Sequence, residues 1–162
     1  MPRRVVASTY VTLDGYIDDS VRSLDGLRVA LQPQLDSVAR EIGAASGVIV
    51  VVDDSPERLA IAAAYELAGP AFDALAQAIM DPRHPIARTV ETGAATYDLR
   101  PVNPGGPALR THMPLIARRG DADHVVGVLA LAHEVPIDPA VRPRLMAAAD
   151  RAAVAIEDAR PA

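Results

Sequence analysis

Two apolar runs on either side of the turn-like segment RRGDAD make up residues 108–134. Runs of this length with a short polar turn between them are typical of a β-hairpin. Because both runs are apolar at almost every position, we expect other parts of the chain to cover both faces of the hairpin. The pattern therefore predicts a hairpin at the centre of a domain.

A second pattern predicts an amphipathic helix between residues 24 and 42, because apolar positions recur there at steps of three and four. Pro33 is expected to bend this helix or delay its start, and Gly43 to end it. The narrow apolar stripe can pack on the domain's own sheet or form a dimer seam. Its members are Leu24, Leu27, Leu31, Leu35, Val38 and Ile42.

The remaining pattern alternates β-branched runs, bounded by turn residues, with stretches of helical spacing. The segment RPVNPGGP at 100–107 holds three Pro and two Gly, which predicts a loop. We find no internal repeat and no interdomain linker, so a single domain is expected. Further strands are predicted at residues 3–13, 47–52, 58–67 and 95–99, and further helices at residues 70–80, 86–92 and 139–160.

Composition removes several kinds of chemistry. The 162-residue chain has no Cys, and all 16 of its basic residues are Arg. Thiol nucleophiles, disulfides, Cys-ligated metal centres, Schiff-base lysines and P-loop lysines are therefore excluded. No G-x-S-x-G or H-E-x-x-H motif occurs, and no His pair has a standard metal-ligand spacing. We expect neither a catalytic constellation nor a metal site.

The charge balance argues against two kinds of partner. A net charge of −5 and an aromatic content of 3% disfavour a nucleic-acid surface. The N-terminus lacks the apolar core of a signal peptide, and no apolar run reaches membrane-spanning length. We therefore expect a cytoplasmic protein without a membrane partner.

The order of these elements resembles that of the GAF domain family over residues 24–160. Its most specific segments are GAASGVIVVVD at 43–53, HPIARTVETG at 84–93 and LRTHMPLIARRGDADHVVGVLALAH at 109–133. The resemblance implies an α+β fold of the GAF or related PAS type. The N- and C-terminal helices would cover one face of an antiparallel sheet, with a ligand pocket under helices and loops on the other. Residues 21–162 would form this domain, and residues 1–20 an N-terminal strand extension.

The resemblance implies a stand-alone regulatory domain in bacterial signal transduction. It would sense a small molecule, bind a protein partner, or form a homodimer through the helices Leu24–Ile42 and Pro139–Arg160. Members that attach a bilin or reduce methionine sulfoxide need Cys, which this chain lacks. The Asn-Lys signature of the cyclic-nucleotide branch is also absent. The sequence identifies no cofactor.

Arg88, Arg100 and Arg110 flank the expected pocket, where guanidinium groups would bind a carboxylate or phosphate. Tyr97 and Thr111 could add hydroxyl donors. The alternative for each Arg is a solvated side chain or an ion pair with a nearby acid. The acids considered are Asp73, Glu91 and Asp98.

Four histidines are further candidates, since the unperturbed pKa of a histidine side chain lies near neutrality. His112 lies within an apolar strand, where it would point into the pocket or serve as a structural side chain. His84 precedes Pro85, where it would fix the start of a helix or face the pocket mouth. His124 is expected at the hairpin turn. The candidate ligand-binding set is therefore Arg88, Tyr97, Arg110, Thr111 and His112.

One segment suggests a different function. The segment RRVVASTYVTLDGYID at 3–18 resembles the opening strand of the RibD C-terminal or dihydrofolate-reductase-like family. That resemblance implies, as the alternative, an NADPH-dependent reductase.

Overall fold

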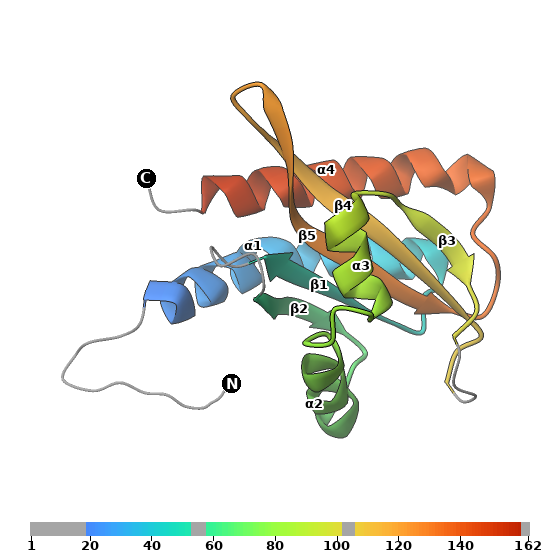
Figure 1. The fold of residues 1–162 in the computed structure, drawn as a ribbon. Coiled ribbons are helices and arrows are strands. Elements are labelled where there is room, and N and C mark those ends of the chain that lie inside the picture. Colours follow the sequence, from blue (N-terminus) through green and yellow to red (C-terminus); the bar gives the residue numbers. More distant parts are fainter. Residues whose placement is uncertain (1–18, 53–57, 102–105, 160–162) are drawn as a thin grey trace.

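The computed structural model describes residues 19–52, 58–101 and 106–159 (Figure 1). The strand predicted at 3–13 and the reductase-like text at 3–18 lie outside the described residues. None of the described helices is long and apolar enough to span a bilayer. The elements are α1 (Asp19–Ile42), β1 (Ser46–Val52), β2 (Leu59–Tyr65), α2 (Gly69–Ala78), α3 (Pro85–Thr92), β3 (Thr96–Leu99), β4 (Leu109–Arg119), β5 (Ala122–His133) and α4 (Arg142–Asp158).

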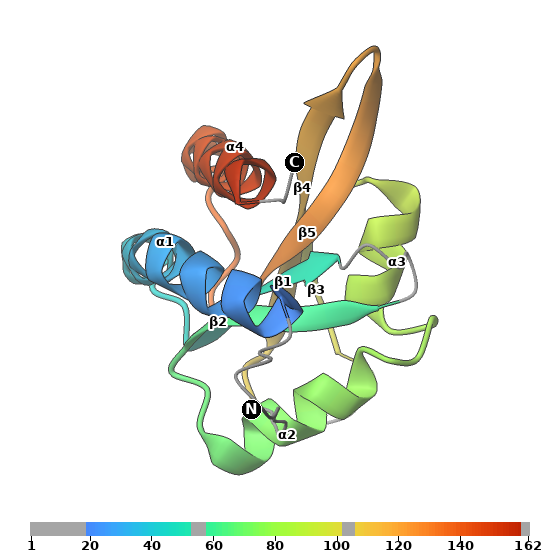
Figure 2. The same cartoon turned by 90° about the vertical axis from the view of Figure 1, so that its left-hand side faces the viewer.

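The strands form one antiparallel sheet in the order β2-β1-β5-β4-β3. The predicted hairpin is β4 and β5, and β5 is the middle strand of the sheet. Gly120 sits in its turn with φ of +62°, a conformation that a residue without a Cβ adopts readily. The tip of the hairpin projects beyond the rest of the sheet (Figure 2). The central position expected for the hairpin is confirmed.

Helices cover both faces of the sheet, which is the predicted α+β arrangement. Figures 1 and 2 show α1 and α4 side by side on one face, and α2 and α3 on the other. Along each strand, successive side chains point to opposite faces. Ile49 and Val51 of β1 accordingly pack under α1 and α4, whereas Val48 and Val50 pack against the α3 side.

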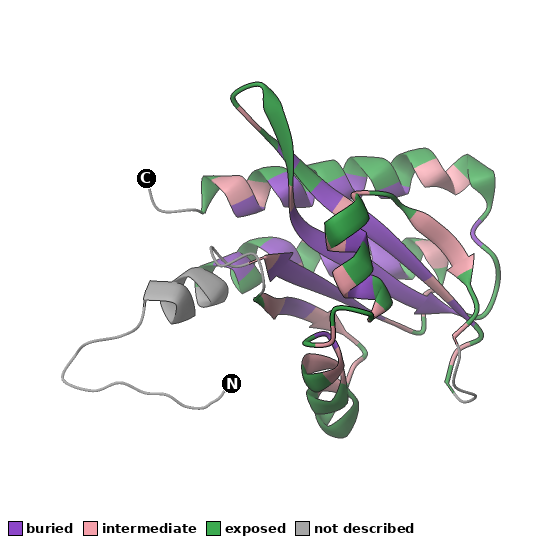
Figure 3. Ribbon diagram, viewed as in Figure 1, coloured by how far each residue is buried: buried purple, intermediate pink, exposed green. Residues whose placement is uncertain are grey.

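The apolar stripes of the two long helices pack on the chain's own sheet. Leu27, Leu31, Leu35 and Val38 of α1 are buried there. In α4, Leu145, Ala149, Ala152 and Ile156 are buried against the same face. Figure 3 shows this buried layer between the helices and the strands. Of the two interpretations of the α1 stripe, packing on the sheet is the one observed.

The expectation that Pro33 delays the helix is wrong. The helix begins at Asp19 and runs through Pro33 to Ile42. Pro33 is exposed, so water can bond the carbonyl that the missing N–H leaves free. The burial of Leu31 and Leu35 on either side stabilises the helix across this position.

One side chain of α1 contacts the backbone of the edge strand β2. The Gln32 Nε2 donates to the Ala64 carbonyl oxygen at 2.7 Å, and the Ala64 N–H donates to Gln32 Oε1 at 3.4 Å. Both bonds occupy backbone groups that point away from β1. Gln32 thus completes hydrogen bonds that a further strand would otherwise make.

Candidate functional site

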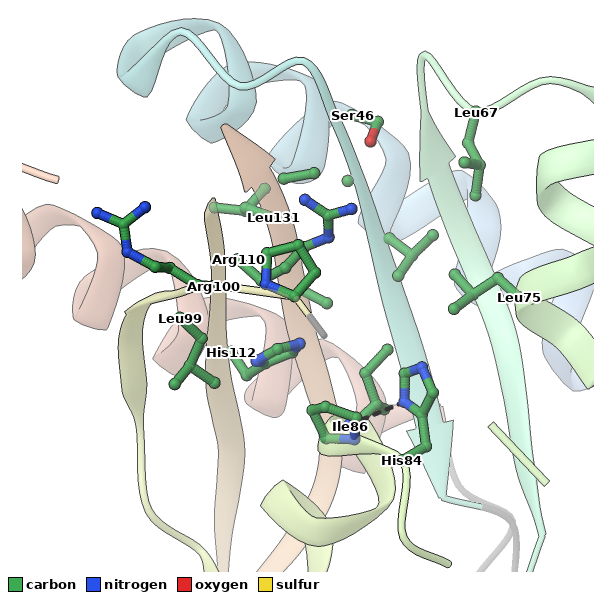
Figure 4. Close-up of a pocket in the computed structure, with 16 residues that line it drawn as sticks. Ser46, Leu67, Leu75, His84, Ile86, Leu99, Arg100, Arg110, His112 and Leu131 are labelled. Atoms are coloured by element: carbon green, nitrogen blue, oxygen red, sulfur yellow. Dashed lines mark hydrogen bonds between the residues drawn. The ribbon is translucent and has the colours of Figure 1, made fainter. Parts of the chain in front are cut away.

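A cavity of about 530 Å³ lies between the sheet and the helices α2 and α3 (Figure 4). It occupies the face opposite α1 and α4, as the pocket was expected to do. Its volume falls within the usual range for small-molecule sites. The lining residues are Ser46, Gly47, Val48, Leu67, Leu75, His84, Pro85, Ile86, Leu99, Arg100, Pro101, Arg110, His112, Ala130, Leu131 and Ala132.

The start of α3 places one histidine at this cavity. Pro85 occupies the first turn, and the His84 Nδ1 accepts a hydrogen bond from the Ile86 N–H at 3.1 Å. Neutral His84 therefore carries its proton on Nε2. Gly93, with φ of +65°, ends the helix. His84 thus fills both roles considered for it, as the helix start and as a residue at the cavity.

Strand β4 supplies two cationic or titratable side chains on one face. Arg110 and His112 are two residues apart, so both point toward the cavity, while Thr111 between them points to the opposite face. Opposite them, β3 contributes Leu99, and Arg100 follows immediately. Figure 4 shows Arg100, Arg110 and Leu99 at one end of the cavity and Leu67 and Leu75 at the other.

His112 is almost completely buried. Burial, and to a smaller extent the positive charges of His84 and Arg110, lower its pKa to about 4. Its Nδ1 lies 3.4 Å from the Thr96 hydroxyl oxygen. His84 is half-buried, and burial also lowers its pKa against the opposing charge of Asp81. Both rings are therefore neutral near pH 7 and act as hydrogen-bonding groups.

The two arginines at the cavity have no acidic partner among the described residues. The Arg110 Nη1 donates to the carbonyl oxygens of Pro107 at 2.6 Å and Leu109 at 3.2 Å. Arg100 is exposed, and no ion pair to it occurs in the described parts of the chain. None of the described residues that line the cavity is Asp or Glu. The ion-pair alternative for these side chains is therefore not observed.

Three of the five predicted ligand residues do not line the cavity. Arg88 is an exposed residue of α3. Tyr97 packs on the α4 side, with the Arg142 guanidinium 4.1 Å from its ring centre. Thr111 is fully buried on that same side. These residues lie away from the cavity because successive residues of a β-strand point to opposite faces, and because Arg88 lies on the outward side of α3.

Thr111 instead belongs to a buried hydrogen-bond network that the sequence did not reveal. Its hydroxyl oxygen lies 2.8 Å from the His133 Nε2, and it accepts from the Asp98 N–H at 3.2 Å. The His133 Nδ1 lies 2.8 Å from the Val135 carbonyl oxygen, which can only accept. Nδ1 therefore carries the proton, and the Thr111 hydroxyl donates to Nε2. Every ring nitrogen of this buried histidine is satisfied.

The network has the residue types of a catalytic triad without its geometry. The Asp98 Oδ1 lies 4.0 Å from the His133 Nε2, the same nitrogen that contacts Thr111. In a triad the acid orients the other ring nitrogen, and the nucleophile is open to substrate. Here the hydroxyl is buried, so these contacts hold the structure together. No group of three or more metal-ligating side chains converges in the part of the chain described.

No protein-family model matches the sequence, and no curated protein matches it. Solved structures do. The GAF domain from an Acinetobacter phosphoenolpyruvate-protein phosphotransferase superposes with a TM-score of 0.63 at 15% identity, covering 89% of this chain and 96% of that one. The second GAF domain of DevS from Mycobacterium smegmatis gives 0.58 at 19% identity, covering 82% and 94%.

This chain has the fold of a GAF domain. The GAF domain of a putative sensor histidine kinase from Pseudomonas syringae pv. tomato also matches, with a TM-score of 0.52 at 18% identity and coverage of 86% and 91%. The resemblance inferred from the three sequence segments is confirmed at the level of the fold. Within this GAF fold, the cavity lies under α2 and α3 and brings Arg110 and His112 together with Arg100 and His84.

Proposed function

We propose that this chain is a non-catalytic regulatory domain of a signalling system that binds a small organic anion in the cavity under α2 and α3. The observation that carries the proposal is that Arg110 and, at the rim, Arg100 both line one largely apolar cavity, whose described lining contains no acidic residue. The GAF domains it resembles come from a phosphotransferase and a sensor histidine kinase, which supports the signalling role.

The shape of the cavity favours an anion with an apolar body. Guanidinium groups bind carboxylate or phosphate by paired hydrogen bonds. The rest of the lining is mainly aliphatic, with Leu67 and Leu75 on the side of the cavity opposite Arg100 and Ile86 beside His84. A net charge of −5 would disfavour anions at an average surface, so a local pair of cations matters more here than in a basic protein.

The test is calorimetric titration of the full chain with octanoate, octyl phosphate and octanol. We expect the two anions to bind and octanol to bind at least about tenfold more weakly, because charged hydrogen bonds to Arg are lost. Arg110→Gln should weaken anion binding by a similar factor, and Arg88→Gln, at an exposed arginine outside the cavity, should not change it.

Two results would contradict this proposal. Octanol binding as tightly as octanoate would show that the arginines do not recognise the charge. Equal effects of the Arg88 and Arg110 substitutions would show that binding occurs elsewhere. Saturable oxidation of NADPH by the pure protein would instead support the reductase alternative.

We also propose that the chain forms a homodimer through the helices Leu24–Ile42 and Pro139–Arg160. Three large apolar side chains on these helices are exposed: Val29 (78%), Met146 (55%) and Val154 (59%). Burying such residues against a second copy would remove them from water. This surface lies on the opposite side of the molecule from the cavity, so both roles are compatible.

Light scattering of the full chain at micromolar concentration tests the dimer. We expect a dimer mass for the wild type and a monomer mass for Met146→Glu combined with Val154→Glu. Met80→Glu is the matched control, because Met80 is equally exposed (59%) but follows α2 on the other face. A monomeric wild type, or dissociation by the control as well, would exclude this interface.

A further inference from the structure

The strand β3 contains an irregularity next to the cavity. Thr96 pairs with His112 and Leu99 pairs with Arg110, so β3 advances by three residues where β4 advances by two. Asp98, within this bulge, has φ of +56°, which is uncommon for a residue other than Gly. Bulges redirect side chains and are common next to functional sites. This bulge separates residues that face the cavity from residues that face α4.

The bulge places neighbouring residues on opposite sides of the sheet. Leu99 and Arg100 line the cavity, whereas Asp98 bonds toward the α4 side. Strand β4 repeats the arrangement, because Thr111 on the α4 side lies between the cavity residues Arg110 and His112. In both strands, therefore, a residue that faces the cavity lies next in sequence to a residue that faces α4.

On the α4 side, these residues hold the linker that joins β5 to α4. The Asp98 Oδ1 accepts from the Ile137 N–H at 2.9 Å. The Thr111 hydroxyl orients His133, whose Nδ1 donates to the Val135 carbonyl oxygen. Ile137 itself is buried, with 6% of its surface exposed. The position of the linker thus depends on side chains whose immediate neighbours line the cavity.

A third bond fixes the beginning of the same linker. The Ala108 N–H, just before β4, donates to the Glu134 Oε1 at 2.6 Å. Ala108 precedes Arg110 by two residues. The start of β4 and the bulge of β3 together therefore carry the contacts to the linker, and they also carry both cavity arginines.

We propose that the β3 bulge couples the cavity to α4. An anion bound in the cavity at Arg110 and Arg100 shifts Asp98 and Thr111, and so changes the hydrogen bonds by which they hold the linker at Ile137. This inference rests on the proposed ligand site. A bulge has discrete arrangements because strand register changes by whole residues, and it can therefore act as a two-state element. The strained conformation of Asp98 disfavours its present arrangement and lowers the cost of leaving it.

The first test needs no ligand, because coupling is reciprocal. Asp98→Ala in the full chain removes the acceptor for Ile137 and disfavours the positive φ. By NMR we expect the Ile137 amide to exchange about fivefold faster or more, and the ring resonances of His84 and His112 in the cavity to shift. Asp98→Asn keeps an acceptor and tolerates positive φ, so it should restore both readouts.

Thr89→Val is the control, because Thr89 is a buried threonine whose hydroxyl donates to the Pro85 carbonyl outside the network. It should leave exchange at Ile137 unchanged. If Asp98→Ala frees Ile137 while the cavity resonances stay at their wild-type positions, the two faces are independent and the inference is overturned. If Asp98→Ala does not fold, Glu134→Ala at the exposed end of the linker takes its place. Exchange of the Ile137 amide and the ring resonances of His84 and His112 are then measured in that variant, and unchanged cavity resonances overturn the inference in the same way.

The second test uses octanoate at saturation. We expect exchange at Ile137 to change by about fivefold in the wild type, and Arg110→Gln to abolish the change. Octanoate that binds without altering Ile137 would overturn the coupling and leave the proposed function standing. If octanoate does not bind, the ligand class proposed for the cavity fails, and the Asp98 variants decide the coupling.

Discussion

His112 shows how one residue's environment determines its chemistry. From the sequence, its position in an apolar strand left two interpretations, a cavity residue and a structural histidine. The structure supports a combination of both, because the ring lines the cavity and is 4% exposed. The pKa of about 4 follows from the burial, which favours the neutral ring. Pattern alone could not provide this value, since burial depends on α3 packing over the strand.

The lowered pKa predicts a pH dependence of stability. The folded state binds fewer protons than the unfolded state between the folded pKa of about 4 and the ordinary histidine value of 6.5. The free energy of unfolding should therefore fall as pH decreases through this window. Between about pH 7 and about pH 4.5 we expect His112 to contribute a loss on the order of 2 kcal/mol.

Urea denaturation of the wild type and His112→Gln at the two pH values measures this contribution. The substituted protein should lose less stability on acidification, because Gln does not titrate. His84 titrates in both proteins, so its effect cancels in the comparison. Identical losses in the two proteins would show that His112 does not resist protonation in the folded state.

Among the elements, the strands and helices could be predicted from spacing, but their irregularities could not. The hairpin, the helix ended by Gly93 and the last helix all follow from apolar periodicity and turn residues. The bulge in β3 has no such signal, because TYDL reads as an ordinary short strand. Thr111 lies away from the cavity because it alternates with Arg110 and His112 along β4, and Tyr97 of β3 packs on that same α4 side.

Contact between β5 and α4 depends on a residue without a side chain. A Cβ on Gly127 would lie 2.5 Å from the Val50 carbonyl oxygen, 3.1 Å from a Leu115 methyl carbon and 3.3 Å from one of Ile156. The nearest atom belongs to the backbone of β1 and cannot move aside. We expect Gly127→Ala to lower the free energy of unfolding by about 2–3 kcal/mol.

Gly26→Ala provides the matched control for this substitution. Gly26 lies within α1, and a Cβ added to it would meet no atom of the described residues within 4 Å. Because Ala favours the helix more than Gly does, this change should stabilise the protein by about 0.5–1 kcal/mol. Chemical denaturation of both variants gives the comparison. A Gly127→Ala protein as stable as the wild type would mean that the sheet can widen at this point.

For the whole molecule, resemblance and pattern predicted the layers but not the contents of the cavity. The covering of each sheet face was foreseeable, because both hairpin strands are apolar throughout. The cavity also depends on Leu67 and Leu75, which come from a connection and a helix with no distinctive motif. Arg100 was foreseen at the cavity as a flanking residue, and its exposed position agrees with a place at the rim.

The unequal burial of the helices and strands predicts the order in which these elements unfold locally. In α2 no residue is buried, whereas α4 buries six and β5 is buried along most of its length. Hydrogen exchange followed by mass spectrometry should show α2 exchanging first and the central strands last, because local opening needs less energy where little apolar surface is covered. Slow exchange throughout α2 would contradict this order.

The side-chain amide of Gln32 bears on how this chain avoids aggregation. The unpaired backbone N–H and C=O groups of an edge strand can pair with the edge strand of another molecule, and repeated pairing of this kind builds extended ribbons. By donating to the Ala64 carbonyl and accepting from its N–H, Gln32 closes the outer margin of β2 at that point. Copies crowded together in a cell are thereby hindered from open-ended stacking at this edge, which is compatible with the closed pairs proposed above.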